Sequence, residues 1–161
     1  MGMRRTVVMA SRRACLTAVA GLAVVACGGA ASSDPGPLRG SFSGQRARVD
    51  GIVSELGATL TRAGPQPDAL LSNEFSALGA RAEQEAAVIA GLGHPPGYNT
   101  RLRDLDHALG AVASGLDQLS TAATEHQPAA TRADISALRG DAAAVRATAA
   151  SLARMLGLRS S

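Results

Sequence analysis

The chain has 161 residues, with 16 Lys and Arg against 13 Asp and Glu, and a formal net charge of +3. Every basic residue is an arginine, which excludes chemistry that needs a lysine, such as a P-loop or a Schiff base. Four arginines and no carboxylates precede Cys27, so the rest of the chain has 12 arginines, 13 carboxylates and a formal charge of −1. This balance argues against a nucleic-acid partner, which would require a basic surface.

The N-terminal segment has the order of charge and hydropathy that is typical of an export signal. A positive region is followed by an apolar stretch of about a dozen residues, 14–25, which is shorter than the roughly 20 residues that cross a bilayer. The positive region contains Arg4, Arg5, Arg12 and Arg13. We therefore expect residues 1–26 to be a signal peptide that is removed.

The end of this segment, Val24-Val25-Ala26-Cys27, resembles the lipobox of bacterial lipoproteins. The resemblance covers only residues 1 to about 30. It implies cleavage between Ala26 and Cys27, a thioether-linked lipid on Cys27 and acylation of the new N-terminus. It also implies a location on the outer, extracytoplasmic face of the cell membrane. With Cys15 removed and Cys27 lipidated, no thiol would remain for a disulfide, a metal site or a nucleophile.

The route of export has two interpretations. Residues 11–16, Ser-Arg-Arg-Ala-Cys-Leu, look like the twin-arginine export motif, with Cys15 where a phenylalanine is usual. A twin-arginine substrate would fold, and could load a cofactor, before it crosses the membrane. The alternative is that the arginine pairs only provide the positive region of a general secretory signal.

Residues 28–41 are rich in Gly, Ser and Pro and show no apolar periodicity, so we predict a lipidated Cys27 followed by a flexible tether over 27–41. A flexible chain of about 14 residues has a mean reach on the order of 20 Å, which is enough to clear the lipid headgroups.

Beyond the tether, apolar residues recur at helical spacing in four consecutive segments. The first segment contains Val49, Ile52, Val53, Leu56 and Leu60. The second contains Leu71, Phe75, Leu78, Ala82, Ile89 and Leu92. The third has an unbroken 3-4 pattern of Leu102, Leu105, Leu109, Val112, Leu116, Leu119 and Ala123. The fourth repeats it with Ile135, Leu138, Ala142, Val145, Ala149, Leu152 and Leu156.

Turn-forming residues separate these segments at 64–68 and 93–97, and a short loop is expected near residues 125–130. Asn99 or Thr100 can cap the third helix, and Thr131 with Asp134 resembles a capping box at the start of the fourth. No segment alternates with a period of two. We predict an all-α fold, an up-down-up-down four-helix bundle over residues 42–158.

In this topology one end of the bundle would gather several residues that could serve a cofactor: His94, Tyr98, His107, Phe42 and Met155. A histidine and methionine pair can hold a haem iron. Asp104 precedes His107 by three residues, as in di-metal bundles, but those bundles need two such motifs. We expect ordinary packing for Met155 and a surface position for His107, and predict no cofactor or metal site.

Glu85 continues the apolar spacing of the second segment, and a buried carboxyl there would point to function. A slip of one residue would place Ala86 at the core instead, and Arg81 could then pair with Glu85 on the surface. We favour the surface pair. The spacings of Arg46 with Asp50 and of Arg103 with Asp106 also predict solvated ion pairs.

No nucleophile or placed acid and base pair is recognisable, so we expect no enzyme. The leading interpretation is a lipid-anchored, extracytoplasmic bundle that binds another protein or a cell-envelope component without catalysis. The alternative is a bundle that binds a small ligand, a metal or haem at the membrane surface through His94, Tyr98 and His107.

Overall fold

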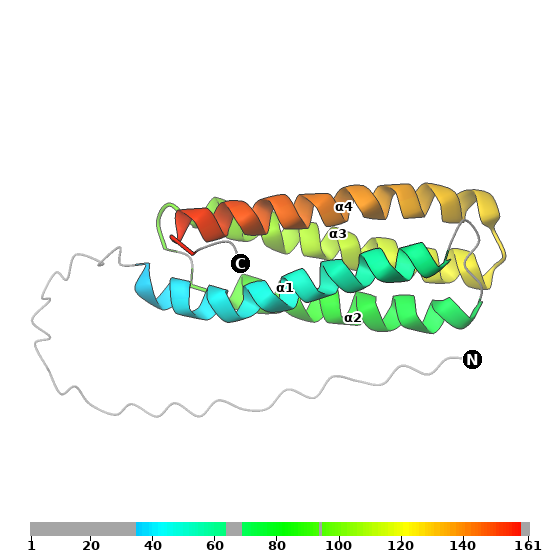
Figure 1. Cartoon of the computed structure of the whole chain (residues 1–161), viewed down its shortest axis with the longest axis horizontal. Helices are drawn as coiled ribbons and strands as arrows, with labels where there is room; N and C mark the ends of the chain where they lie inside the picture. The colour runs from blue at the N-terminus through cyan, green and yellow to red at the C-terminus, as the bar shows by residue number, and fades with distance from the viewer. Residues whose placement is uncertain (1–34, 64–68, 94, 159–161) are drawn as a thin grey trace, which may run out of the picture. The chain divides into compact units, whose positions relative to one another are not determined.

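The structure, a computed structural model, describes residues 35–63, 69–93 and 95–158. The predicted signal peptide, Cys27 and the tether up to residue 34 lie outside these residues. The described chain forms four helices, α1 (Gly36–Ala63), α2 (Ala69–Gly91), α3 (Asn99–Thr124) and α4 (Pro128–Met155), and contains no strand (Figure 1). The all-α prediction is confirmed.

The four helices form a bundle in which each helix packs against two others. Helices α1 and α3 both lie beside α2 and α4, so α1 is diagonal to α3 and α2 is diagonal to α4. Helices adjacent in the sequence run side by side in opposite directions (Figure 1). This is the predicted up-down-up-down arrangement.

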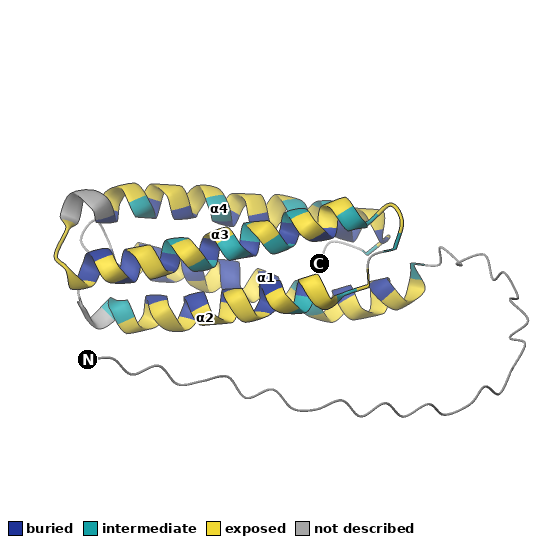
Figure 2. Ribbon diagram, turned by 180° about the vertical axis from the view of Figure 1, so that it is seen from behind, coloured by how far each residue is buried: buried dark blue, intermediate teal, exposed yellow. Residues whose placement is uncertain are grey.

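The core consists of the apolar residues that the helical spacing selects, and Figure 2 shows them as buried stripes along each helix. The seven seam residues predicted for α3 and the seven predicted for the fourth segment are all buried, as are the five predicted for α1. Of the residues predicted for the second segment, Leu71, in the first turn of α2, and Leu92, just beyond its last residue, are only partly buried.

Close approach between helices depends on small residues of α2 and α3. A Cβ added at Gly79 of α2 would lie 3.4 Å from the Leu116 Cβ of α3. One added at Gly115 of α3 would lie 3.0 Å from the Leu138 Cγ of α4. A Cβ added at Gly40, Gly44, Gly51 or Gly57 of α1 would have no atom within 4 Å, and α1 packs less closely against its neighbours than α3 does.

A cluster of hydroxyl groups joins α2 to α3 near one end of the bundle. The buried Ser120 hydroxyl lies 2.7 Å from the Ser72 Oγ and 3.0 Å from the Ser76 Oγ. The Thr124 hydroxyl donates to the Ser120 carbonyl at 2.9 Å. These short side chains satisfy one another's polar atoms where the two helices lie close together.

Helix α1 begins earlier than predicted, which corrects the boundary between tether and bundle. Residues 36–41, assigned to the tether from their composition, are helical, and Leu38 is buried. The Arg39 Nε donates to the Leu156 carbonyl at 2.6 Å, just beyond the end of α4. These contacts with other parts of the bundle order a segment whose own sequence favours turns.

The predicted helix caps are wrong. The residue preceding α3 is Tyr98 and makes no side-chain capping bond, while the Asn99 Oδ1 has no hydrogen-bond partner. Helix α4 begins at Pro128, and the Thr131 hydroxyl donates backward to the Gln127 carbonyl at 2.8 Å. Proline at the first helical position explains the earlier start, because it has no N–H group that would need a partner there.

Two helices end in the same type of turn, with a residue of positive φ after the last helical turn. After α4, Gly157 has a φ of 66°, and the Leu158 N–H donates to the Ala153 carbonyl at 2.9 Å. After α3, His126 has a φ of 57°, and the Gln127 N–H donates to the Ala122 carbonyl at 3.0 Å. The left-handed conformation is strained for histidine but not for glycine.

We therefore expect His126→Gly to raise the free energy of unfolding by about 1 kcal/mol, because glycine adopts this conformation without steric cost. The matched change Gly157→Ala should lower it by a similar amount, since a Cβ there would also meet the Arg39 guanidinium. Chemical denaturation of both variants measures the two effects. A destabilised His126→Gly variant would contradict the assignment of strain.

Candidate functional site

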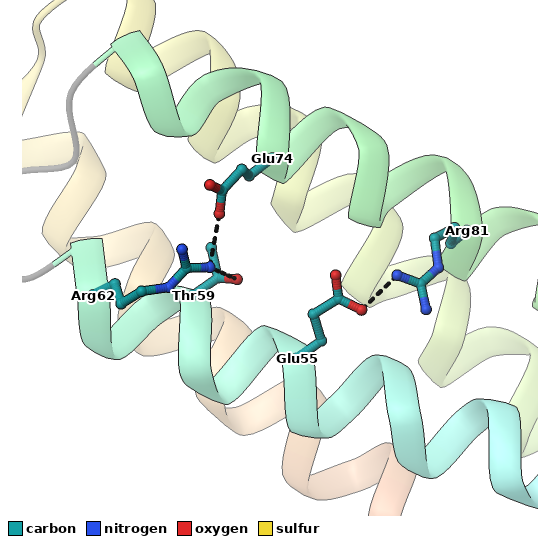
Figure 3. A network of polar contacts seen from close by, with 5 residues as sticks. All are labelled: Glu55, Thr59, Arg62, Glu74 and Arg81. Carbon is teal, nitrogen blue, oxygen red and sulfur yellow. Dashed lines mark hydrogen bonds and ion pairs between the residues drawn. The ribbon is translucent and has the colours of Figure 1, made fainter.

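Helices α1 and α2 are joined at their surface by two ion pairs (Figure 3). The Arg62 guanidinium lies 2.8 Å from the Glu74 carboxylate and also donates to the Thr59 hydroxyl at 3.2 Å. Further along, Arg81 of α2 pairs with Glu55 of α1. Both pairs are about half exposed, so each contributes little stability by itself, about 0–1 kcal/mol.

The ion pairs follow a seven-residue spacing on both helices. Arg62 and Glu55 are seven residues apart on α1, and their partners, Glu74 and Arg81, are seven apart on α2. One further step leads to Arg48 on α1 but to Val88 on α2. At the third position of the series an exposed arginine therefore meets an aliphatic side chain in place of a carboxylate.

A groove of about 320 Å³ lies at this third position, between α1 and α2. We call it the α1–α2 groove. Its lining includes Arg48, Gly51 and Ile52 from α1 and Arg81, Glu85 and Val88 from α2. A Cβ at Gly51 would have no atom within 4 Å, so this glycine leaves the α1 side open. No residue of α3 or α4 lines the groove.

Glu85 is the buried ionisable residue of the groove. Its side chain is 5% exposed, and the Oε1 atom makes no hydrogen bond. Burial raises the pKa of the Glu85 carboxyl above its usual range, and the nearby Arg48 charge offsets part of this rise. A cleft that holds a carboxyl with a perturbed pKa and an unsatisfied oxygen is a candidate functional site.

These positions overturn the prediction of a surface pair between Arg81 and Glu85. Arg81 pairs with Glu55 on the neighbouring helix, and Glu85 and Ala86 are both buried. Helix α2 packs against α1 on one side and α3 on the other, so two adjacent positions of the helix can both be buried.

Two other buried side-chain oxygens in the described residues have no hydrogen-bond partner, the Gln45 Oε1 and the Asn99 Oδ1. Neither residue lines the α1–α2 groove, and neither is ionisable. A buried carboxyl has a larger desolvation cost than a buried amide. Glu85 is therefore the one of the three that points most directly to a ligand.

The structure brings together only part of the predicted histidine end of the bundle. The Tyr98 hydroxyl lies 3.5 Å from the Met155 main-chain carbonyl. The Met155 side chain is 45% exposed and Phe42 is fully buried. His107 is exposed, and His94 lies outside the described residues.

No group of three or more His, Cys, Asp or Glu side chains that could hold a metal ion occurs in the described ranges. Asp104, which the spacing with His107 had singled out, pairs instead with Arg101 at 3.2 Å. Of the two other predicted surface pairs, Arg46 with Asp50 is present at 3.7 Å, and no ion pair joins Arg103 to Asp106.

A second groove, of about 490 Å³, runs between α2 and α3. It is lined mainly by small residues, with two exposed acids, Glu83 and Asp117. The polar side chains of this groove are exposed and can form hydrogen bonds with water. The α1–α2 groove is therefore the better candidate site.

Comparisons with protein-family models, with curated proteins and with solved structures found no significant match for this chain. Within the described residues, no helix has an apolar stretch long enough to span a membrane.

The raised pKa of Glu85 makes stability depend on pH. Because the folded chain holds this proton more tightly than the unfolded chain does, stability falls as pH rises from the unfolded pKa, about 4.3, through the folded pKa. We expect Glu85→Met to raise the free energy of unfolding by about 1–3 kcal/mol at neutral pH and by less near pH 4. Urea denaturation across this pH range measures the difference.

The exposed neighbour Glu83 provides the control. Glu83→Met should change the free energy of unfolding by no more than about 0.5 kcal/mol, with no trend in pH. Equal pH profiles for the wild-type chain and Glu85→Met would show that the buried carboxyl has an ordinary pKa.

Proposed function

We propose that this chain is a lipid-anchored, extracytoplasmic helical bundle that binds another protein or a cell-envelope component and performs no catalysis. The anchor rests on the resemblance of Val24-Val25-Ala26-Cys27 to a lipobox. The binding role rests on one observation, the buried and unsatisfied Glu85 carboxyl beside the Arg48 charge in the α1–α2 groove.

The buried, unsatisfied Glu85 carboxyl lowers the stability of the unbound chain. A buried polar atom with no hydrogen bond costs about 1–3 kcal/mol, and a hydrophobic residue of similar size at position 85 would avoid that cost. Helix α2 already has aliphatic residues at its other core positions, such as Leu78 and Ile89. A partner that completes the hydrogen bonds of Glu85 and the charge of Arg48 would recover this free energy on binding.

A small-ligand binding role is the second candidate, and the size of the same groove favours it. Sites for small molecules occupy about 300–1,000 Å³, and the α1–α2 groove lies at the lower end of that range. The exposed Met155 and His107 give less support to a ligand at the predicted histidine end.

Metabolic labelling with an alkyne fatty acid tests the anchor. We expect the wild-type chain to incorporate the label and Cys27→Ala to lose it, because the modified thiol and the cleavage site are removed together. Cys15→Ala is the matched control and should keep the label, since Cys15 belongs to the predicted signal. Label retained in Cys27→Ala would refute the anchor at this residue.

Site-specific photo-crosslinking in intact cells tests the binding surface. A crosslinker at Gln84, an exposed residue of the α1–α2 groove, should yield a discrete adduct, and Arg48→Gln in the same chain should reduce it. The same crosslinker at Gln118, an exposed residue of α3 outside the groove, is the control. Identical adducts from both positions would contradict binding through this face.

A further inference from the structure

We propose that the α1–α2 groove binds a small aliphatic monocarboxylate, whose carboxylate bridges the Arg48 guanidinium and the Glu85 carboxyl while its alkyl chain lies along Ile52 and Val88. This inference rests on the second of the proposed functions, binding of a small ligand, and names the class of ligand that the groove accepts.

The charges of the groove select an anion. Two arginines line it, and Arg81 is already paired with Glu55. Arg48 makes no ion pair among the described residues, although its charge acts on the nearby Glu85 carboxyl. Val88 stands where the seven-residue spacing would place a counterpart on α2. A cationic ligand would meet the Arg48 charge, whereas a carboxylate would complete the third ion pair of the series.

The Glu85 carboxyl favours the same ligand. Burial favours the neutral form of this group, and a neutral carboxyl carries an O–H that can donate a hydrogen bond. The charged groups that line the groove with it are Arg48 from α1 and Arg81 from α2, the latter held by Glu55. A carboxylate can accept two parallel bonds from a guanidinium and a short bond from a carboxylic acid, both of which are charge-assisted.

The rest of the lining selects a short alkyl chain. Ile52 is 3% exposed, Val88 is partly buried, and Gly51 leaves open space on the α1 side. A volume of about 320 Å³ has room for a short-chain acid of about four to six carbons. A dicarboxylate would place its second charge against these aliphatic side chains, where it would have no partner.

Calorimetric titration of the full chain, purified in a non-ionic detergent, tests the inference with three probes of matched length: butyrate, butyramide and butylamine. We expect saturable binding of butyrate in the millimolar range, much weaker binding of butyramide and none of butylamine. Butyrate should bind more weakly as the pH rises through the raised pKa of Glu85, because the carboxyl then loses the proton that it donates.

Substitutions of Arg48 and Glu85 test whether these two side chains bind butyrate. Arg48→Gln should weaken butyrate binding about tenfold or more, whereas Arg139→Gln, a matched change at an exposed residue of α4, should leave it unchanged. Glu85→Gln keeps an N–H donor at the same place and should retain butyrate binding with a flat pH profile. Circular dichroism of each variant confirms that the bundle is folded.

The inference fails if butylamine binds more tightly than butyrate, if no probe binds, or if Arg48→Gln binds butyrate as the wild type does. Absence of binding would show that the α1–α2 groove does not accept a short carboxylate. Crosslinking from Gln84 separates this failure from that of the proposed function. A groove-dependent adduct without butyrate binding would support the proposed binding function and refute only the carboxylate ligand.

Discussion

The close packing of α3 between α2 and α4 is the constraint on which the rest of the structure depends. Gly79 lets α2 approach Leu116 of α3, and Gly115 lets α3 approach Leu138 of α4. Interhelical distance depends on the side chains at the contact, so glycines at these two points bring the three helices close together along a continuous aliphatic seam. The hydroxyl cluster around Ser120 satisfies the polar atoms that this approach buries.

Helix α1 is held in the bundle by contacts of a different kind. Its glycines lie away from neighbouring atoms, and it is joined to α2 by exposed ion pairs and to the end of α4 through Arg39. Its interface with α2 holds the α1–α2 groove. The lining of the candidate site comes only from these two helices, and its open α1 side is left by Gly51.

The ion-pair series gives the α1–α2 interface its register. Arg62 with Glu74 and Glu55 with Arg81 resemble the charged pairs that flank the seam of a coiled coil and select the orientation of partner helices. A third pair would have closed the surface between α1 and α2. Val88 interrupts the series, and the interruption leaves Arg48 next to a buried carboxyl in a solvent-accessible groove.

The sequence by itself determined the fold, because apolar residues at a spacing of three and four must share one face of a helix, and four such faces bury one another most simply in a bundle. It did not determine where α1 begins, since residues 36–41 are ordered by contacts with the end of α4. Nor did it reveal the site. The partner of Arg81 and the burial of Glu85 depend on how α1 is placed against α2, and only the tertiary structure decides which side chains of two separate helices face each other.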